Sequence, residues 1–245
     1  MQLPYCGLPP SPETLLSRFN FDPILIAALA LVAAMHWFSV RRRDGIYLAS
    51  AGWTVAAVAL ISPLCALSVS LFAARVGQHM VLVLCAAPLL ALATPAVSMR
   101  WARRGLWLAT LTFFAALWFW HMPAPYDATF ASTPVYWAMH LSLFGSAVAL
   151  WRALLRSPRQ LGGDVLLAGV LTSMQMGFLG AILTTASRPL YFQHLATTQF
   201  WGLTPLQDQQ LGGVLMWVPG IALFLWAGIF AVGRLRTLAE RTKPA

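Results

Sequence analysis

Apolar residues run along this chain in long blocks separated by short polar segments. The blocks lie at about 23–40, 47–71, 76–95, 106–122, 134–154, 164–186 and 211–233. Each is close to the roughly 20 apolar residues that a helix needs to cross the hydrocarbon core of a bilayer. The pattern predicts an all-α, polytopic membrane protein with seven transmembrane helices. No repeat or low-complexity segment divides the chain, so we expect a single membrane domain over residues 1–245.

Basic residues gather in alternate connections between these blocks. All but Arg18, Arg75 and Arg188 of the 16 lysines and arginines lie in four clusters. Because basic loops are retained on the cytoplasmic side, the clusters predict an N-terminus outside and a cytoplasmic C-terminus. They are found at 41–43, 100–104, 152–159 and 234–243.

Composition adds limits on partners and on processing. The net charge of +9 is explained by this topology and by attraction to anionic inner-leaflet lipid, so we expect lipid and no nucleic acid as a partner. The first apolar block precedes its arginines, which indicates an anchor rather than a cleaved signal peptide.

Cys6, Cys65 and Cys85 form an odd, widely spaced set. They predict neither a CxxC motif nor a disulfide framework.

Prolines and glycines modify individual spans. Pro63 and Pro88 interrupt the second and third spans, and each frees a backbone carbonyl that a neighbouring group must satisfy. Gly177 and Gly180 allow another helix to approach the sixth span closely. The longest connection, residues 187–210, mixes aromatic and polar residues, as is typical of a segment at the outer interface.

Histidines and one aspartate fall near the predicted outer ends of several spans. His79, His121 and His140 lie within about one helical turn of each other in depth, and Asp208 directly precedes the last span. Ionisable groups inside a membrane are costly, so their presence favours a functional site. A histidine bonded to a backbone carbonyl is the structural alternative, which we favour for His36 and His194.

Methionines accompany these histidines. Met80 and Met139 are each adjacent to a histidine, and Met216 lies on the last span. Thioether and imidazole together are the ligands that suit Cu(I), which prefers soft donors. Adjacent residues of a helix point in different directions, however, and ordinary packing is the alternative for all three. The methionines are therefore weaker candidate ligands than the histidines.

Sequence motifs for catalysis are missing from the chain. It contains no GxSxG, P-loop or HExxH motif. We therefore do not expect an enzyme.

Several strings near the outer face resemble the CtaG family of bacterial cytochrome c oxidase assembly factors, the seven-span type named for the caa oxidase. The resemblance covers about residues 60–225, and its two most distinctive strings are those around His121 and Asp208. The strings are Gln78-His79-Met80 leading to Ala87-Pro88, Trp120-His121-Met122-Pro123 followed by Tyr126-Asp127, and Asp208-Gln209-Gln210 leading to Met216-Trp217-Val218-Pro219-Gly220.

The resemblance implies a multi-pass protein of the bacterial inner membrane that helps to install copper in the oxidase. Oxidase subunits and periplasmic copper donor or acceptor proteins are the implied partners. One position departs from the family pattern. Family members often carry a second histidine four residues before His79, where this chain has Arg75. Residues spaced by four share a helix face, so His79 is left without that partner.

From these residues we expect a shallow, outward-open site for Cu(I). His79, His121 and His140 would supply nitrogen, and Met80, Met139 or Met216 a sulfur. Asp208 would ligate the ion or orient a histidine from behind, as carboxylates often do. Two alternatives stay open: a haem held between two histidines, and a metal-free scaffold that holds a nascent oxidase subunit through the outer connection.

Overall fold

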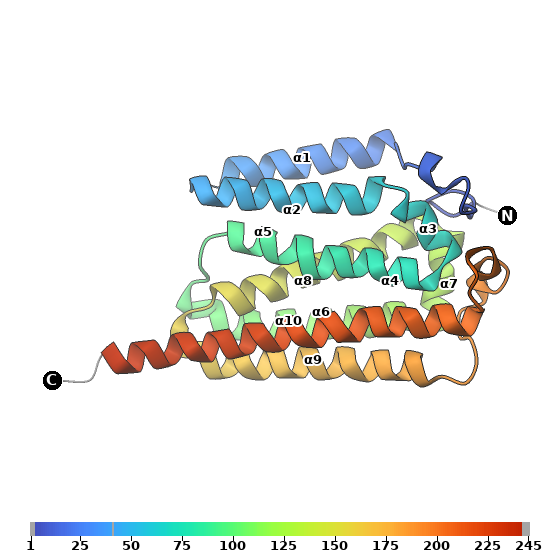
Figure 1. Cartoon of the computed structure of the whole chain (residues 1–245). Helices are drawn as coiled ribbons and strands as arrows, with labels where there is room; N and C mark the ends of the chain where they lie inside the picture. The colour runs from blue at the N-terminus through green and yellow to red at the C-terminus, as the bar shows by residue number, and fades with distance from the viewer. Residues whose placement is uncertain (1–2, 41, 242–245) are drawn as a thin grey trace.

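The computed structural model describes residues 3–40 and 42–241, and every regular element among them is helical (Figure 1). This confirms the predicted all-α class. The longer helices are α1 (Pro23–Ser39), α2 (Arg43–Ile61), α3 (Leu64–Ser70), α4 (Phe72–Met80), α5 (Ala87–Ala93), α6 (Met99–His121), α7 (Pro123–Ala131), α8 (Thr133–Arg156), α9 (Gly162–Thr185) and α10 (Pro205–Arg241). The short elements are a π-helical segment, η2 (Val81–Ala86), and the 3-10 turns η1 (Leu15–Ser17), η3 (Arg159–Leu161), η4 (Phe192–His194) and η5 (Thr198–Trp201).

The long helices are apolar enough to make this a multi-pass membrane protein. Among the described residues, 5 helices are long and apolar enough to cross a membrane, or 6 if α6 and α7, which meet at a 75° bend, form one broken span. α1 corresponds to the remaining predicted span, but it has only 17 residues. Large apolar side chains such as Ile24, Phe38 and Trp226 are exposed on the surface, where lipid would cover them.

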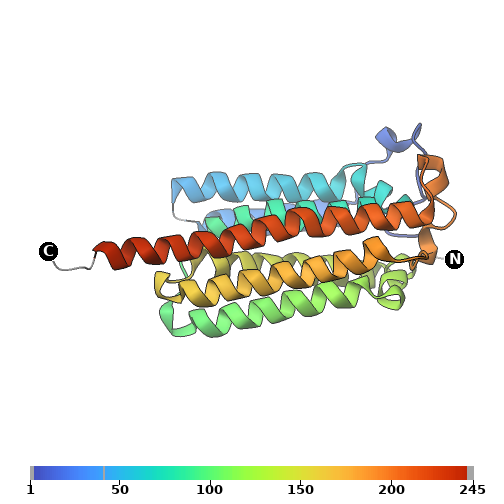
Figure 2. The same ribbon diagram turned by 60° about the horizontal axis from the view of Figure 1, so that its bottom comes forward.

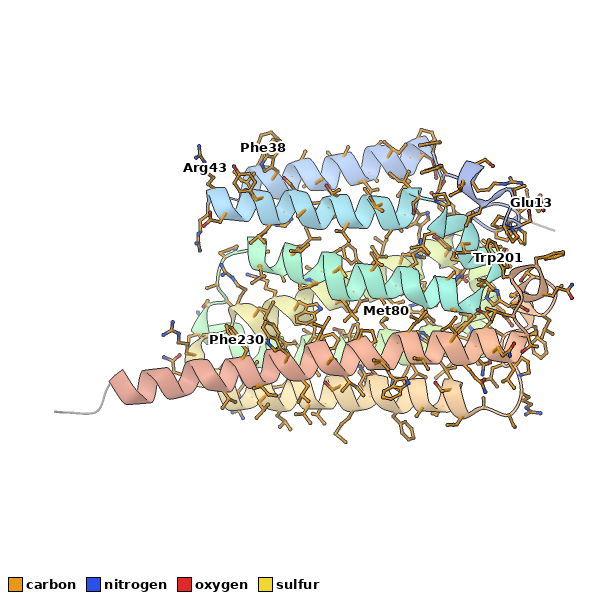
Figure 3. The ribbon with its side chains drawn as sticks, viewed as in Figure 1. Glu13, Phe38, Arg43, Met80, Trp201 and Phe230 are labelled. Atoms are coloured by element: carbon orange, nitrogen blue, oxygen red, sulfur yellow. A yellow bond between two sulfur atoms is a disulfide. The ribbon has the colours of Figure 1, made fainter. Side chains whose placement is uncertain are left out.

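The two ends of the helix bundle differ in character. The α1–α2, α5–α6 and α8–α9 connections and the C-terminal end of α10 lie together at one end (Figure 1). These segments carry the basic clusters, of which Arg41 and Lys243 lie outside the described residues. Arg43 marks this end in Figure 3, and Glu13 and Trp201 mark the opposite end. The N-terminal segment, α3, α7 and the long connection before α10 gather at that opposite end.

The segment that carries His79 is one helix with a local change of winding. α4, η2 and α5 follow one another from Phe72 to Ala93, and the π-helical turns begin directly after Met80. Pro88 has no N–H to give to a carbonyl of the preceding turn. In a π-helix the bond would run to the fifth residue back, Val83. The Val83 carbonyl instead accepts a hydrogen bond from Trp151 Nε1 of α8, at 2.7 Å.

The backbone carbonyl freed by Pro63 also receives a hydrogen bond from a side chain of another helix. α2 ends at Ile61, and Pro63 precedes α3. The carbonyl four residues before Pro63 is that of Ala59, and it accepts a hydrogen bond from Gln78 Nε2 at 2.8 Å. Side chains from other helices thus replace both missing backbone donors, as the sequence predicted for Pro63 and Pro88. The bond from Gln78 also fixes the turn of α4 next to His79.

α9 and α10 are in close contact along most of their length, as both ribbon views show (Figures 1 and 2). Glycines permit this approach. A Cβ atom added to Gly180 would lie 2.5 Å from Cβ of Trp217, and one added to Gly177 would lie 2.9 Å from Ile221. These distances are too short for real side chains, which confirms the role predicted for the two glycines.

The N-terminal segment is covalently tied to α3. Cys6 and Cys65 form a disulfide with a Cα–Cα distance of 5.5 Å. The prediction that the cysteines form no disulfide framework was therefore wrong, since two of the three are joined. Their separation of 59 residues hid the pairing, because only the fold brings the N-terminal segment back over α3. Hydrogen bonds from Asn20 N to Ile61 O and from Ser70 Oγ to Pro10 O hold the segment in place.

We expect Gly180→Ala to weaken the contact between α9 and α10. The added methyl group forces Trp217 or the α10 backbone to shift, at a cost of about 1–3 kcal/mol. Gly145→Ala is the matched control, because nothing lies within 4 Å of a Cβ added there. Thermal unfolding of the detergent-solubilised variants measures the difference. Equal midpoints for the two variants would show that the close approach is not required.

Candidate metal site at the His79–His140 pair

Two of the predicted imidazoles lie side by side in the bundle. His79 is in the last turn of α4, and His140 comes from α8. Their ring centroids are 5.0 Å apart with an interplanar angle of 72°. Both side chains are buried, with 5% and 3% of their surface exposed. The sequence predicted a shallow, open site, and the structure instead places this pair inside the protein.

Hydrogen bonding fixes the tautomer of His140. Its Nδ1 lies 3.1 Å from the carbonyl oxygen of Tyr136. Because a carbonyl only accepts hydrogen bonds, Nδ1 carries the proton and Nε2 keeps its lone pair. Nε2 of His140 and Nε2 of His79 are both buried without a hydrogen-bond partner among the described residues. Buried polar atoms normally have a partner, and such an imidazole nitrogen can serve as a metal ligand.

The surroundings of His140 include a side cavity. A space of about 330 Å³ between α1, α2 and α8 reaches this residue. Its lining is mostly apolar, with Trp53, Trp137 and Phe144 among the larger side chains and Asp22 at one end. The apolar lining provides few ligands for an ion, so the cavity does not enlarge the candidate metal site.

His121 does not join this pair. It is the last residue of α6, and its Nδ1 lies 2.7 Å from the Leu117 carbonyl, so its Nε2 also keeps a lone pair. Its ring meets the edge of Phe72, with centroids 6.4 Å apart. No group of three or more His, Cys, Asp or Glu side chains with metal-binding geometry occurs in the described part of the chain. The structure thus brings together two of the three predicted imidazoles.

Asp208 has a different position from the one expected. Its carboxylate accepts hydrogen bonds from the backbone N–H groups of Phe72 at 2.7 Å and Ala73 at 3.0 Å. These are the first amides of α4, so Asp208 acts as a cap supplied by another helix. Within the described residues its hydrogen bonds go to this backbone and not to an imidazole. The expectation that Asp208 orients a histidine is not met in this structure.

The three candidate methionines are buried in the main apolar core. Met80 is 7% exposed, while Met139 and Met216 are 0% exposed. This position agrees with the packing role weighed against ligation. A sulfur ligand from one of them stays a prediction.

Arg75 lies in an aromatic cage one turn before His79. It is 1% exposed, and its guanidinium carbon is 4.1 Å from the ring centroid of Phe130 and 5.8 Å from that of Tyr136. Arg75 donates hydrogen bonds to the Ser68 carbonyl and to Thr129 Oγ1. No carboxylate forms a salt bridge with it among the described residues. The cation is therefore held inside the protein by rings and neutral oxygens.

Tyr136 is a residue that the sequence reasoning missed. Its ring lies against that of His140, with centroids 4.2 Å apart at an angle of 34°, and its hydroxyl lies 3.3 Å from Cys6 Sγ and 3.7 Å from Cys65 Sγ. It therefore links the histidine pair to the disulfide. The spacing of four between Tyr136 and His140 on one helix was the available signal, because such residues share a face.

The outer connection contributes a further buried histidine. His194 is 2% exposed, and its Nε2 lies 2.6 Å from the hydroxyl of Tyr126. Burial lowers the pKa of His194 to about 3, and the nearby charge of Arg75 acts in the same direction. Burial thus favours the neutral imidazole, and its hydrogen-bond partner is a tyrosine hydroxyl where the sequence predicted a backbone carbonyl.

This shift predicts a loss of stability in mild acid. In the unfolded chain His194 binds a proton below its ordinary pKa of about 6.5, whereas the folded form binds it only near 3. Folding therefore becomes less favourable as the pH falls through this window, by about 2 kcal/mol at pH 5. His194→Gln should lose this part of the pH dependence. Thermal unfolding of the wild type and the variant at pH 7 and pH 5 measures this difference. An equal fall of the unfolding midpoint in both proteins would contradict the role assigned to His194.

A family model described as cytochrome c oxidase caa3 assembly factor (Caa3_CtaG) matches residues 26–237. Searches of curated proteins and of solved structures found no match. The family match spans the helices from α1 to α10 and includes both histidines of the pair. The chain therefore belongs to the caa3-type cytochrome c oxidase assembly factors.

Proposed function

We propose that this assembly factor holds Cu(I) at the His79–His140 pair and passes it on for insertion into a copper centre of the oxidase. The ion is cargo rather than a resident cofactor, and no catalytic step is involved. The observation that carries the proposal is the pair of buried Nε2 atoms that have no hydrogen-bond partner among the described residues, on rings 5.0 Å apart. Oxidase subunits and periplasmic copper donor or acceptor proteins are the partners.

The chemistry of the pair favours Cu(I) among metal ions. Imidazole nitrogen suits copper, and Cu(I) accepts a site of few ligands. The Tyr136 carbonyl holds the other ring nitrogen of His140, the outer interaction that commonly orients a metal-binding histidine. Both imidazoles are neutral ligands, so a singly charged ion adds less charge beside Arg75 than a divalent one. A third ligand would come from Met80, Met139 or Met216.

We further propose seven spans in a bacterial inner membrane, with the N-terminus periplasmic and the C-terminus cytoplasmic. The basic clusters lie at one end of the bundle, as expected for a cytoplasmic face. The Cys6–Cys65 disulfide lies at the other end, which suits an oxidising compartment. The His79–His140 pair is nearer to this second end, from which copper would be delivered.

The haem alternative is disfavoured by the geometry of the pair. A haem clamped by two histidines lies between their rings. The rings of His79 and His140 are 5.0 Å apart and meet edge to face, so they already fill that space.

One observation favours the metal-free scaffold as a second candidate. The outer connection is fixed to the bundle by bonds from Leu190 N to Gln209 Oε1 and from Thr197 Oγ1 to Ser70 O. Phe192 and Phe200 of this connection nevertheless have 69% and 61% of their surface exposed. Exposed rings on a fixed loop provide a contact surface for another protein.

We expect the double variant His79→Ala/His140→Ala to lose Cu(I) binding. Because both ligands are removed, affinity should fall by more than the roughly 10- to 100-fold that follows loss of an outer partner. Competition with a chromophoric Cu(I) chelator under anaerobic conditions measures it. His36→Ala is the matched control, since His36 lies toward the basic end and its Nδ1 accepts a hydrogen bond from Trp53.

Oxidase activity in cells separates the two candidate functions. A double variant that binds no Cu(I) and fails to assemble active oxidase supports copper handling. Unchanged Cu(I) affinity in the double variant would overturn the proposed site. Normal oxidase assembly without Cu(I) binding would favour the scaffold, and substitutions of Phe192 and Phe200 would then impair assembly.

A further inference from the structure

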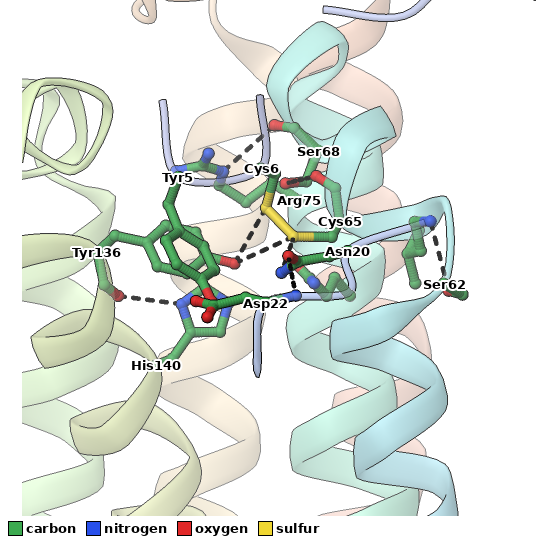
Figure 4. The surroundings of a disulfide bond; sticks show 12 residues. Tyr5, Cys6, Asn20, Asp22, Ser62, Cys65, Ser68, Arg75, Tyr136 and His140 are labelled. Atoms are coloured by element: carbon green, nitrogen blue, oxygen red, sulfur yellow. Dashed lines mark hydrogen bonds between the residues drawn. A yellow bond between two sulfur atoms is a disulfide. The ribbon is translucent and has the colours of Figure 1, made fainter. Parts of the chain in front are cut away.

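The Cys6–Cys65 disulfide lies next to the histidine pair, although nothing in the proposed function uses it. The hydroxyl of Tyr136 is 3.3 Å from one sulfur and 3.7 Å from the other, and the ring of Tyr136 contacts that of His140. Figure 4 shows His140 below Tyr136 and the disulfide beside that ring. One aromatic side chain thus lies between two sulfur atoms and an imidazole whose Nε2 has no hydrogen-bond partner in the described part of the chain.

The N-terminal segment covers this region. The ring of Tyr5 stacks on Tyr136 with centroids 4.8 Å apart and meets the edge of Trp137 at 5.1 Å. Its hydroxyl donates a hydrogen bond of 2.5 Å to Asp22. Cys6 directly follows Tyr5, so the disulfide locks this cover onto α3. Breaking the S–S bond would leave the cover held by non-covalent contacts alone.

Arg75 supplies a charge that the oxidised protein leaves without an anion. Among the described residues it is bonded to a carbonyl and a hydroxyl, and no carboxylate forms a salt bridge with it. A buried cation is costly unless an anion compensates it. Arg75 faces the ring of Tyr136, the same residue whose hydroxyl contacts both sulfurs. An anionic sulfur group here would meet a cation that is already in place.

We propose that Cys6 and Cys65, once reduced, form a second Cu(I) site as a pair of thiolates beside the His79–His140 pair. Thiolates are the soft ligands that Cu(I) prefers. Two thiolates, one Cu(I) ion and the guanidinium of Arg75 together carry no net charge, which favours this state in a buried site. The inference deepens the proposed function and rests on it for the identity of the ion. It makes copper binding dependent on the redox state of this disulfide.

The redox step needs a dithiol reductant at the outer face, of the thioredoxin-like class. One of its thiolates attacks a sulfur of the Cys6–Cys65 bond, and its second thiol then resolves the mixed disulfide. The reductant is oxidised to a disulfide, and Cys6 and Cys65 gain two electrons and two protons. Each thiol releases its proton when it binds Cu(I). Once the S–S bond is broken, rotation about the Cα–Cβ bond of each cysteine can turn its Sγ atom toward the ion.

The test compares the oxidised and reduced forms of the purified full chain. The reduced form is prepared with a phosphine and desalted anaerobically, and both forms are titrated with the Cu(I)–bicinchoninate complex. We expect the reduced form to take up additional Cu(I). For X-ray absorption, Met80, Met139 and Met216 are first substituted, so that no sulfur neighbour of copper comes from these methionines. The spectrum at the copper edge should then show sulfur neighbours in the reduced form and only nitrogen neighbours in the oxidised form.

Variants locate the sulfur ligands. Cys6→Ser/Cys65→Ser should behave as the oxidised protein, and Cys85→Ser should behave as wild type, because Cys85 is a free cysteine outside the disulfide. Arg75→Gln should weaken the additional binding about tenfold, because the compensating charge is lost, while Arg75→Lys should retain it. Thermal unfolding identifies any variant that fails to fold, and the oxidised and reduced wild type still provide the decisive comparison.

The outcomes separate this inference from the proposed function. Equal Cu(I) uptake by both forms without cysteine sulfur around the ion would overturn the second site and leave the histidine pair intact. If the reduced form binds Cu(I) through sulfur and the oxidised form binds no Cu(I), the second site is supported. The histidine pair is then overturned as a site that binds Cu(I) independently of the cysteines. No Cu(I) in either form would overturn both.

Discussion

The helix that carries His79 is held by side-chain hydrogen bonds that join it to three other helices, and the candidate site depends on them. Asp208 of α10 caps its first amides, Gln78 donates to the α2 carbonyl freed by Pro63, and Trp151 of α8 donates to the carbonyl at its π-helical turn. In a membrane no water can replace these partners, so each freed backbone group needs a protein group. The same bonds fix the position of His79 relative to His140.

This network also explains why the predicted cluster of imidazoles became a pair. The Asp208 carboxylate is occupied by the start of α4, and Phe72 at that start lies against His121. The ring of His121 thus contacts Phe72, and it forms no ring contact with His79 or His140 among the described residues.

Charge links the histidine pair to the disulfide. Arg75 is buried without a carboxylate among the described residues, and it shares the Tyr136 ring with the cysteine sulfurs and with His140. The position of Arg75 was known from the sequence as a departure from the family pattern. Its significance depends on the aromatic cage, which directs the cation into the protein instead of toward lipid headgroups. A site with this electrostatic balance favours a singly charged ion and anionic sulfur ligands.

The sequence by itself determined the helical class, the approximate limits of the helices and the basic end of the bundle. It also predicted the close helix contact at Gly177 and Gly180 and the neighbouring donors required by Pro63 and Pro88. These features follow from local hydrophobicity, charge and backbone chemistry, which can be read residue by residue.

Only the tertiary structure decided that Cys6 meets Cys65, that Asp208 caps α4, and that His79 faces His140 while His121 does not. Such contacts join residues far apart in the chain, and they depend on how each helix is rotated about its axis, which periodicity in a nearly uniform apolar segment does not specify.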